Sequence, residues 1–360
     1  MKILVNTPFI SSPAGVSNHY LGLKSFFSKD VVYNQYVTNN FLKRKLKLND
    51  GFLLRCIRLV LMGWDVFKFS LRLLFGGDVR VLFNPSFGAT ALKRDLFFAK
   101  IAKFFGKKYS FFIHGWTIPY LNDFISGEKV LPKEFYEAYS FFVLANEFKD
   151  YLIELGVKSP IYLTTTKVND GLLDGVELQE KKVVKNILFL ARIEVAKGIF
   201  TTIDAFKILQ GKGHDLKLTV VGAGNALEDS KKYVFDNEIQ NVCFTGALYG
   251  DDLKHKFIES DIYMLPTTHG EGMPTSVLEA MALGLPIITR PVGGLCDFFE
   301  NDRMGWMIES LDSQEYADKI ECLINNIELY NRISCYNNEY ARNRFLASKV
   351  AVDLEKKLKQ

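Results

Sequence analysis

Short apolar runs alternate with amphipathic segments along nearly the whole chain. Strands separated by helices of about 10–15 residues are typical of parallel sheets built from βαβ units. The expected strands are residues 2–7, 79–84, 109–116, 141–145 and 159–166 in the first half, and 186–193, 216–224, 241–248, 261–267 and 285–290 in the second. The expected helices are 17–27, 92–105, 147–156, 198–211, 227–237 and 251–260, with mainly helical sequence from 313 to 360. The pattern predicts an α/β protein with two parallel sheets, one in each half.

A polar stretch near residues 167–182 interrupts this alternation. A chain of 360 residues is longer than most single domains, so the interruption predicts a domain boundary. We expect a first domain at residues 1–168 and a second at 169–342. The 48% of hydrophobic residues is enough for a core in each domain. A charged last helix is expected from Arg342 to Gln360.

One segment of the first half is unusually apolar for an α/β protein. Residues 52–75 follow the basic run KRKLK at 43–47. Their charged side chains recur at helical spacing and form one stripe: Arg55, Arg58, Asp65, Lys68 and Arg72. Five charges argue against a transmembrane helix. Two interpretations remain open: an amphipathic helix packed on the sheet, or a helix on a membrane surface with its Arg and Lys toward lipid phosphates.

The charge of the chain is divided unevenly between its halves. Residues 1–167 carry 23 Lys+Arg and 12 Asp+Glu, whereas the remainder carries 22 and 29. The basic half indicates either an anionic partner, such as a membrane surface, or an ordinary solvated surface. No motif points to nucleic acid as that partner.

The cysteines and the first residues bear on the compartment. The five cysteines are scattered, without close pairs, which argues against a disulfide framework or a zinc site and indicates a reducing environment. Residues 1–10 do not have the pattern of a signal peptide. We therefore expect a cytoplasmic location, with the basic half available to the inner face of the plasma membrane.

The richest candidate site is the stretch PTTHGEGMPTSVLEAMALGLP at residues 266–286. An expected strand ends at Pro266, a Gly-rich loop follows, and Pro274 and Thr275 open a short helix. The amino end of such a helix binds anions, because its free N–H groups and dipole point at the ligand. Glu271 and Glu279 would repel a phosphate, so hydroxyl groups are their more natural partners. A ligand with both phosphates and hydroxyls is a sugar nucleotide.

Cations and glycines at other strand ends support this ligand. Arg192 and Lys197 flank the turn after an expected strand, where a guanidinium and an ammonium can bind a diphosphate. The turn at Gly222 and Gly224 lets backbone approach a nucleotide, although the dinucleotide motif fails at Leu227. No Asp-x-Asp metal clamp occurs, so the site is expected to work without a metal ion. The alternative is a solvated lysine, a salt-bridged arginine and ordinary turn glycines.

Two elements of the first half end in residues that could face the same ligand. Gly15 lies at a strand-to-helix turn, with Asn18 and His19 on the first turn of the helix. His114 ends an expected strand and precedes a glycine, at the sheet edge where α/β proteins bind ligands. The structural alternatives are a turn glycine with positive φ and a buried histidine.

Together these motifs resemble glycosyltransferase family 4, whose members are retaining enzymes with the two-domain GT-B fold. The resemblance rests on the spacing of Glu271 and Glu279 within GEGMPTSVLEAMALGLPII. ARIEVAKG, VVGAG, FIHGW and PAGVSNH resemble further segments of the family in the same order. The fold implied is two Rossmann-like parallel-sheet domains facing across a cleft. A C-terminal helix, about residues 343–360, would cross back to the N-terminal domain.

The resemblance implies a role for each matching residue. Glu279 would bind the ribose hydroxyls of the donor, and Glu271 the hydroxyls of its sugar. Arg192 and Lys197 would stabilise the departing diphosphate, and His114 would line the reacting centre. The candidate catalytic residues are therefore Glu271, His114, Arg192 and Lys197. The candidate donor-binding residues are Gly15, Arg192, Lys197, Gly222, Gly224, Gly272, Met273, Pro274, Thr275 and Glu279.

The implied function is sugar transfer from a nucleotide-diphosphate sugar to a glycan or a polyprenyl-diphosphate-linked acceptor, in bacterial cell-surface polysaccharide synthesis. The second domain would bind the donor and the first the acceptor. No cofactor is expected, and the donor would be a UDP-sugar, with a GDP-sugar as the alternative. Two other functions stay open: a sugar-nucleotide epimerase of similar fold, and a non-catalytic subunit that binds sugar nucleotides.

Overall fold

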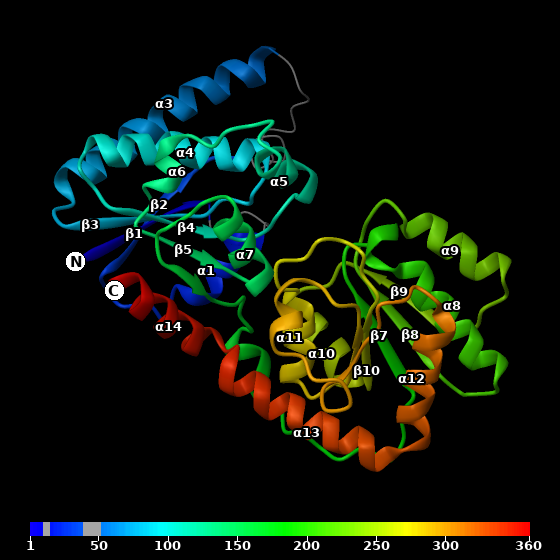
Figure 1. Ribbon diagram of the computed structural model, residues 1–360. Coiled ribbons are helices and arrows are strands. Elements are labelled where there is room, and N and C mark those ends of the chain that lie inside the picture. The colour runs from blue at the N-terminus through cyan, green and yellow to red at the C-terminus, as the bar shows by residue number, and fades with distance from the viewer. Residues whose placement is uncertain (10–14, 39–51) are drawn as a thin grey trace. The chain divides into compact units, whose positions relative to one another are not determined.

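A computed structural model describes residues 1–9, 15–38 and 52–360 of the chain (Figure 1). The basic run at 43–47, and Pro13 and Ala14 of the PAGVSNH segment, lie outside the described residues. The chain divides into two compact units. The first comprises Met1–Lys167 and Ala347–Gln360, and the second comprises Val168–Leu346.

The first unit is built on a parallel six-stranded sheet. Its strands are β1 (Lys2–Pro8), β2 (Val31–Tyr36), β3 (Val79–Phe83), β4 (Tyr109–Ile113), β5 (Ser140–Val143) and β6 (Ile161–Leu163). Their order across the sheet is β2-β1-β3-β4-β5-β6. β3 and β4 are buried at every position, as expected for apolar runs covered on both faces. The order of the strands reverses between β1 and β3, where open α/β sheets bind ligands.

Helices cover both faces of this sheet. They are α1 (Gly15–Leu23), α3 (Phe52–Phe75), α4 (Ala89–Phe104), α5 (Ile118–Ile125), α6 (Lys133–Tyr136), α7 (Asn146–Glu154) and α14 (Ala347–Lys359). The phenylalanines of the chain concentrate in this core. Phe111 lies 5.8 Å from both Phe135 and Phe141, measured between ring centroids, so strands and helix α6 share one aromatic cluster.

The second unit contains a second parallel six-stranded sheet. Its strands are β7 (Asn186–Leu190), β8 (Lys217–Val221), β9 (Val242–Gly246), β10 (Ile262–Leu265), β11 (Ile287–Thr289) and β12 (Gly305–Met307). Their order is β12-β11-β10-β7-β8-β9, which is the order 3-2-1-4-5-6 of Rossmann-type sheets read from the other edge. The reversal point lies between β7 and β10. The two sheets confirm the prediction of two parallel α/β domains.

The helices of the second unit alternate with its strands. They are the 3₁₀ turns η1 (Asp170–Leu173), η2 (Val195–Lys197) and η3 (Gly293–Asp297), and the helices α8 (Ile199–Gly211), α9 (Leu227–Asp236), α10 (Gly250–Glu259), α11 (Thr275–Ala282), α12 (Ser313–Asn325) and α13 (Ile327–Arg344). α11 packs on α13, and α8 packs on α12. Asp312 caps α12 by accepting a hydrogen bond from the Gln314 N–H at 3.0 Å.

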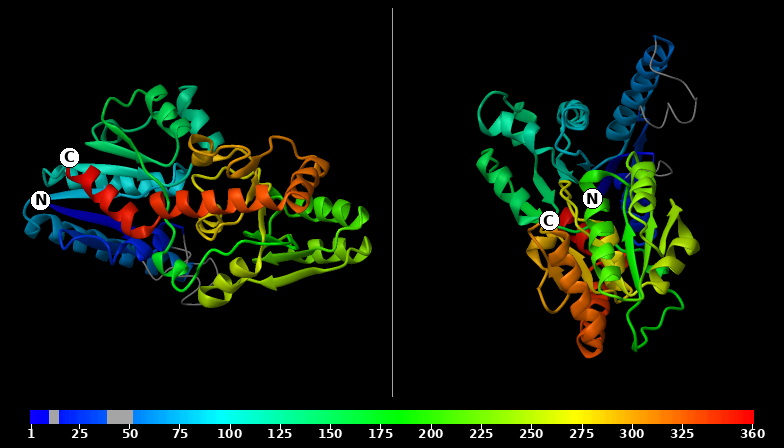
Figure 2. Two further views of the ribbon diagram at one scale, coloured as in Figure 1. Left: turned by 90° about the horizontal axis from the view of Figure 1, so that it is seen from below. Right: turned by 90° about the vertical axis from the view of Figure 1, so that its right-hand side faces the viewer.

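Helix α14 returns the end of the chain to the first unit, where it lies beside α1 (Figures 1 and 2). The Ser28 backbone N–H donates to Glu355 at 2.9 Å, and Lys357 donates to the Leu163 carbonyl at 2.8 Å. Buried Arg80 also donates to the Leu358 carbonyl, at 2.5 Å. These bonds tie the last helix to three separate parts of the first unit.

Several elements differ from the sequence pattern. The pattern does not predict β2, α5, α6 or β12, each of which is short or carries polar residues within the element. The expected single helix from Arg342 to Gln360 is wrong, because α13 ends at Arg344 and α14 begins at Ala347. In between, Val168 N–H donates to the Phe345 carbonyl at 2.7 Å, which fixes the chain where it leaves the second unit.

In α3 a charged residue lies on the packed side of the helix and large apolar residues are exposed, whereas a solvated charged stripe would place the charges outward. Asp65 is buried, accepts a hydrogen bond from the Val37 N–H at 3.1 Å, and pairs with Lys68 at 2.8 Å. Phe69 and Leu73 are fully buried on the same side. The charged stripe therefore borders the packed face, and apolar side chains face outward. One side of α3 thus packs on the first unit, as the first interpretation expects, and the contact with a membrane surface stays a prediction.

Among the described residues, no helix is long and apolar enough to cross a membrane.

Candidate active site

The candidate site of the second unit lies at the reversal point of its sheet. β7 and β10 are parallel neighbours, so the loops after their carboxyl ends emerge side by side. The loop after β7 carries Arg192 and Lys197, and the loop after β10 carries Glu271. Sheet topology thus brings together residues that are about 75 positions apart in the chain.

Lys197 and Glu271 form an ion pair across these two loops. The ammonium of Lys197 donates to Oε1 of Glu271, and the two side chains are only 8% and 19% exposed. Removing two charges from water is costly, so the pair persists only because each group compensates the other. An ammonium group at this position can bind a diphosphate. Glu271 can then accept hydrogen bonds from hydroxyl groups instead of from Lys197.

Backbone hydrogen bonds hold the two loops together. The carbonyl of Ala196 accepts from the N–H groups of Thr268 at 2.8 Å and His269 at 3.1 Å. Gly198 follows with φ +83°, and a Cβ there would lie 2.4 Å from the Pro266 carbonyl oxygen. Only glycine fits this contact, so Lys197 is held in place from both sides.

A third segment closes around the Glu271 loop. The Gly294 N–H donates to the Gly272 carbonyl at 2.9 Å. Gly293 has φ +48°, and a Cβ on it would lie 2.1 Å from the Glu271 carbonyl oxygen. The Gly293-Gly294 pair therefore supports the loop that carries Glu271 and Gly272.

Helix α11 begins directly after this loop. Pro274 is its N-cap, and within the described residues no side chain caps its first turn. Met273 and Pro274 are buried, whereas Thr275 and Glu279 are partly exposed. Glu279 lies one turn inside the helix, on the segment that begins at the switch point. The free N–H groups of the first turn of α11 therefore lie directly after the Glu271 loop, and such groups can bind an anion.

Tyr263 on β10 forms hydrogen bonds that connect this helix to the sheet. Its hydroxyl lies 2.9 Å from the Leu190 carbonyl oxygen and 2.7 Å from Oγ of Ser276. Burial raises the pKa of Tyr263 well above its usual value, an effect that the Ser276 hydrogen bond opposes and the charges of Glu279 and Glu271 strengthen. The neutral phenol therefore joins β7, β10 and α11 next to both carboxylates.

The glycines after β8 have a packing role of their own. A Cβ on Gly222, which has φ +144°, would lie 1.9 Å from the Ala191 carbonyl oxygen. A Cβ on Gly224 would lie 2.1 Å from the Ile193 carbonyl oxygen. Both glycines let this turn pack against the end of β7, whatever they contribute to a ligand.

Arg192 is the most exposed of the candidate cations. Its Nη1 lies 2.6 Å from Oε1 of Glu194, and 60% of its side chain is exposed. An exposed ion pair of this kind contributes little to stability. Arg192 is therefore free to exchange its partner for a ligand at low cost.

In the first unit, His114 lies at the carboxyl end of β4. Its ring stacks on Phe112 at 3.9 Å between centroids, and its Nε2 lies 3.1 Å from Oδ1 of Asn84. Because an amide oxygen only accepts, Nε2 carries the proton and Nδ1 is the acceptor. Burial lowers the pKa of His114 to about 3, so the imidazole is neutral at neutral pH.

The other two candidates of the first unit differ from each other. Gly15 begins α1 without a positive φ, and no described atom lies within 4 Å of where its Cβ would be. Turn geometry therefore does not explain this glycine. His19 is buried, 5.3 Å from His114 between ring centroids, so it lies behind the end of β4 and the expectation that it faces a ligand stays a prediction.

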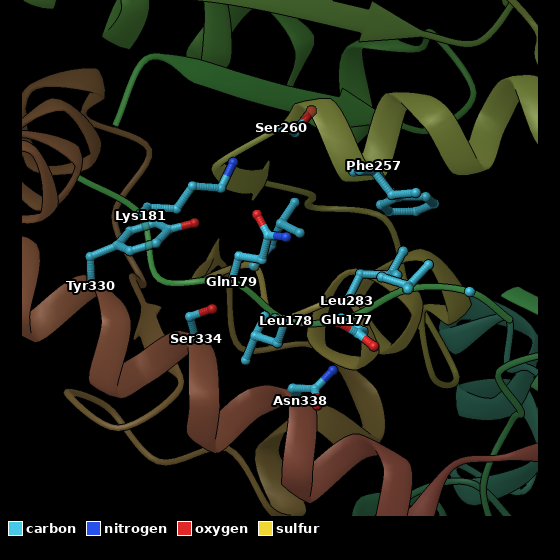
Figure 3. A pocket seen from close by; sticks show the side chains of 15 residues that line it. Glu177, Leu178, Gln179, Lys181, Phe257, Ser260, Leu283, Tyr330, Ser334 and Asn338 are labelled. Atoms are coloured by element: carbon cyan, nitrogen blue, oxygen red, sulfur yellow. The ribbon is translucent and has the colours of Figure 1, made fainter. Parts of the chain in front are cut away.

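A cavity of about 590 Å³ lies elsewhere in the second unit, between the segment 175–181, α10 and α13 (Figure 3). Ser260 precedes β10 and Leu285 precedes β11, so the cavity is at the amino ends of the strands. Glu271 follows β10 at the opposite edge. The cavity is thus separate from the candidate site.

Within the described part of the chain, no group of His, Cys, Asp or Glu residues could hold a metal ion.

Comparison with known proteins bears directly on the second unit. Residues 176–340 match the sequence model of the family described as "Glycosyl transferases group 1". This segment belongs to the group 1 glycosyl transferases. It spans nearly all of the second unit and includes Arg192, Lys197, Glu271 and Glu279.

Two curated relatives of this glycosyl transferase segment act in polysaccharide synthesis by name. The capsular polysaccharide biosynthesis glycosyltransferase CapM of Staphylococcus aureus is 32% identical over 191 residues, which are 51% of this chain and 49% of CapM. The amylovoran biosynthesis glycosyltransferase AmsK of Erwinia amylovora is 30% identical over 137 residues, which are 36% of this chain and 34% of AmsK. The chain therefore spans half or less of the length of these relatives.

Solved structures resemble the whole chain in fold. The crystal structure of HepE from Anabaena in complex with UDP has a TM-score of 0.74 and 15% identity, and the match covers 100% of both chains. At this identity the likeness shows the fold alone, which is the GT-B fold. Tyr263 and Gly293 support the site but were not expected there from the sequence. Their only local signal is a glycine or an aromatic residue beside a strand end.

Proposed function

We propose that this protein is a retaining glycosyltransferase that moves a sugar from a nucleotide diphosphate to a glycan or a lipid-linked acceptor. The observation that carries the proposal is the buried pair of Lys197 and Glu271 at the switch point of the second sheet. It supplies one cation for a diphosphate and one carboxylate for sugar hydroxyls, inside the segment that matches the group 1 family.

In the proposed reaction, the bond between the anomeric carbon and the diphosphate oxygen breaks. The acceptor hydroxyl oxygen forms the new bond on the same face of the sugar, and its proton passes to the departing phosphate oxygen. Negative charge grows on that oxygen as the bond breaks. Lys197 and Arg192 would stabilise it, which is the contribution that usually dominates such catalysis.

The remaining residues would position the donor. Glu271 would bind hydroxyls of the sugar, and Glu279 hydroxyls of the ribose. The backbone of Gly272, Met273, Pro274 and Thr275 would contact sugar and phosphate. Gly222 and Gly224 would approach the nucleotide, and Gly15 the diphosphate. His114 would accept a hydrogen bond through Nδ1.

A UDP-sugar is the proposed donor, supported by the UDP complex of HepE, with a GDP-sugar as the alternative. Cell-surface polysaccharide synthesis is supported by the names of CapM and AmsK. We place the reaction at the inner face of the plasma membrane, with no metal ion in the chemistry and with the first unit, Met1–Lys167 and α14, binding the acceptor. The basic charge of residues 1–167 supports a contact with anionic lipid there.

A panel of UDP- and GDP-sugars tests the function. Each donor is incubated with and without acceptor, and products are followed by NMR, which also reports the anomeric configuration. Transfer with retention is expected for one donor. Conversion of the donor's sugar without any acceptor would favour an epimerase, and binding without turnover would favour a non-catalytic subunit. An inverted product would overturn retention alone.

We expect Glu279→Ala to weaken donor binding by about 10²-fold or more, because two hydrogen bonds from hydroxyls to a carboxylate together contribute about 3 kcal/mol. Turnover at saturating donor should change little. Isothermal titration with the nucleoside diphosphate measures the affinity. Glu259→Ala, an exposed carboxylate at the end of α10, is the control. Unchanged affinity in Glu279→Ala would remove the ribose role.

A further inference from the structure

The outer face of α3 is apolar, although it is the face that points away from the first unit. Its exposed side chains at the helical spacing of this face are Val60, Trp64, Phe67, Leu71, Leu74 and Phe75. They include Val60 at 73% and Phe75 at 79% exposure. A patch of this kind is rare on a protein surface unless something covers it. Figure 1 shows α3 as the outermost layer of the first unit, with α4 beside it.

Helix α4 extends the apolar surface. α3 and α4 are in contact, and α4 exposes Phe97 and Phe104, the latter at 85%. Trp64 and Phe67 lie 5.6 Å apart between ring centroids on the outer face of α3. We call the exposed side chains of these two helices the α3–α4 face. A helix of 24 residues is about 36 Å long, so the face is extended rather than a single pocket.

The exposed charges that α3 and α4 themselves contribute are of one sign, and Lys103 pairs with Glu137 of a neighbouring segment at 2.5 Å. Within residues 54–75 and 89–104 the basic side chains are Arg55, Arg58, Lys68, Arg72, Lys93, Arg94, Lys100 and Lys103. The acidic side chains of these ranges are Asp65 and Asp95, and both are buried in ion pairs. The rim of the α3–α4 face is therefore cationic, while its centre is aliphatic and aromatic.

We propose that the α3–α4 face lies in the surface of an anionic bilayer, with its apolar side chains among the acyl chains and its basic side chains at the lipid phosphates. An interfacial helix needs a broad apolar side and cations at its border, and α3 with α4 provides both. The long Arg and Lys side chains can reach the phosphates from the sides of the helices. The proposal rests on the proposed function only for its biological role, since it names the membrane contact of that enzyme.

A second copy of the chain fits this face less well. Two copies meeting face to face would bring one cationic rim against the other, with no exposed carboxylate of α3 or α4 to pair with it. Like charges that face each other across an interface are unfavourable and suppress such a contact. An anionic bilayer meets the apolar centre and the cationic rim at once.

Tryptophan emission can report insertion directly. The chain has three tryptophans, of which Trp116 and Trp306 are buried and Trp64 is 55% exposed. On addition of vesicles of phosphatidylcholine with phosphatidylglycerol, we expect a blue shift of the emission and quenching by lipids brominated on the acyl chain. We also expect the protein to sediment with these vesicles, and high salt to weaken the binding without abolishing it.

Two matched variants identify the surface. Phe67→Glu, on the α3–α4 face, should weaken vesicle partitioning by about ten-fold or more. Phe235→Glu, at a phenylalanine of α9 in the second unit that is more exposed than Phe67, should stay within about two-fold of wild type, the scale of a neutral surface change. Circular dichroism and melting temperature establish that both variants fold.

Four results would overturn the proposal. They are no binding by the wild type, binding that high salt abolishes without acyl-chain quenching, equal partitioning of the two variants, and a dimer in ultracentrifugation that Phe67→Glu dissociates. None of these measurements needs a donor or turnover. An inactive protein that still inserts Trp64 would therefore contradict only the proposed function.

Discussion

Replacing Lys197 with alanine lowers the rate of sugar transfer by about 10²-fold or more, which is the expected loss for one contact to charge that develops in a transition state. Lys197 lies in a dry position, 8% exposed, where a charge interacts more strongly than in water. Its partner Glu271 holds it in place before the donor arrives. The measurement is single-turnover transfer from the donor that the sugar-nucleotide panel selects.

The same substitution also has a cost in stability, which must be separated from the chemistry. Glu271 loses its buried partner, so the free energy of unfolding should fall by about 2 kcal/mol. The double variant Lys197→Ala/Glu271→Ala should recover part of this stability and none of the turnover. Lys207→Ala, at an exposed lysine of α8, is the control for removing a positive charge from the same region.

Arg192→Ala completes the test of the diphosphate assignment. Arg192 is exposed and paired with Glu194, so its removal should leave stability nearly unchanged while turnover falls. Near-wild-type turnover in both Lys197→Ala and Arg192→Ala would overturn the assignment. A loss of turnover in Lys197→Ala alone would keep Lys197 and assign Arg192 to the surface.

Much of the second unit follows from the sequence by simple rules. Each parallel strand there ends at a turn, and the motif residues Lys197, Gly222 and Glu271 all follow such ends. In a parallel sheet those ends share one edge, so topology alone gathers them. The sequence also predicts the helix between Pro274 and Gly284, because Pro is favoured at the start of a helix and Gly just after its end for steric reasons.

The side chains that hold the site together could not be predicted in the same way. Tyr263 is one aromatic residue in an apolar strand, and its bonds to Leu190 and Ser276 depend on strand order. Gly293 contacts the Glu271 loop because β11 pairs with β10, and this pairing cannot be seen in the local sequence. Contacts of this kind are set by tertiary packing, which local sequence does not encode.

Helix α3 shows a different limit of sequence reasoning. The spacing of its charges correctly predicts a helix with one charged stripe. Spacing does not say which side faces the core, and the usual assumption puts charge in water. Here Asp65 is instead buried and accepts a hydrogen bond from the N–H of Val37, directly after β2, an element that the pattern does not predict. A pattern that omits β2 cannot show that Asp65 lies on the packed side of α3.

The support of the Glu271 loop by Gly293 leads to the second large expected effect. In Gly293→Ala the new methyl group would lie 2.1 Å from the Glu271 carbonyl oxygen and 2.3 Å from that of Gly272. Both neighbours are backbone atoms, so a side-chain rotation cannot relieve the overlap. The φ of +48° adds about 1 kcal/mol of strain for any residue with a Cβ.

We expect Gly293→Ala to displace the loop, to lower the free energy of unfolding by about 3 kcal/mol, and to weaken donor binding by about ten-fold or more. Gly213→Ala isolates the strain, because Gly213 has φ +88° and no described atom within 4 Å of its Cβ position. It should lose only about 1 kcal/mol and bind the donor like wild type. Equal donor affinity in the two variants would mean that the position of the Glu271 loop does not govern binding. A loss confined to Gly293→Ala would tie donor recognition to the backbone that Gly293 supports, since both substitutions place a Cβ at positive φ but only Gly293→Ala brings the methyl group against backbone atoms.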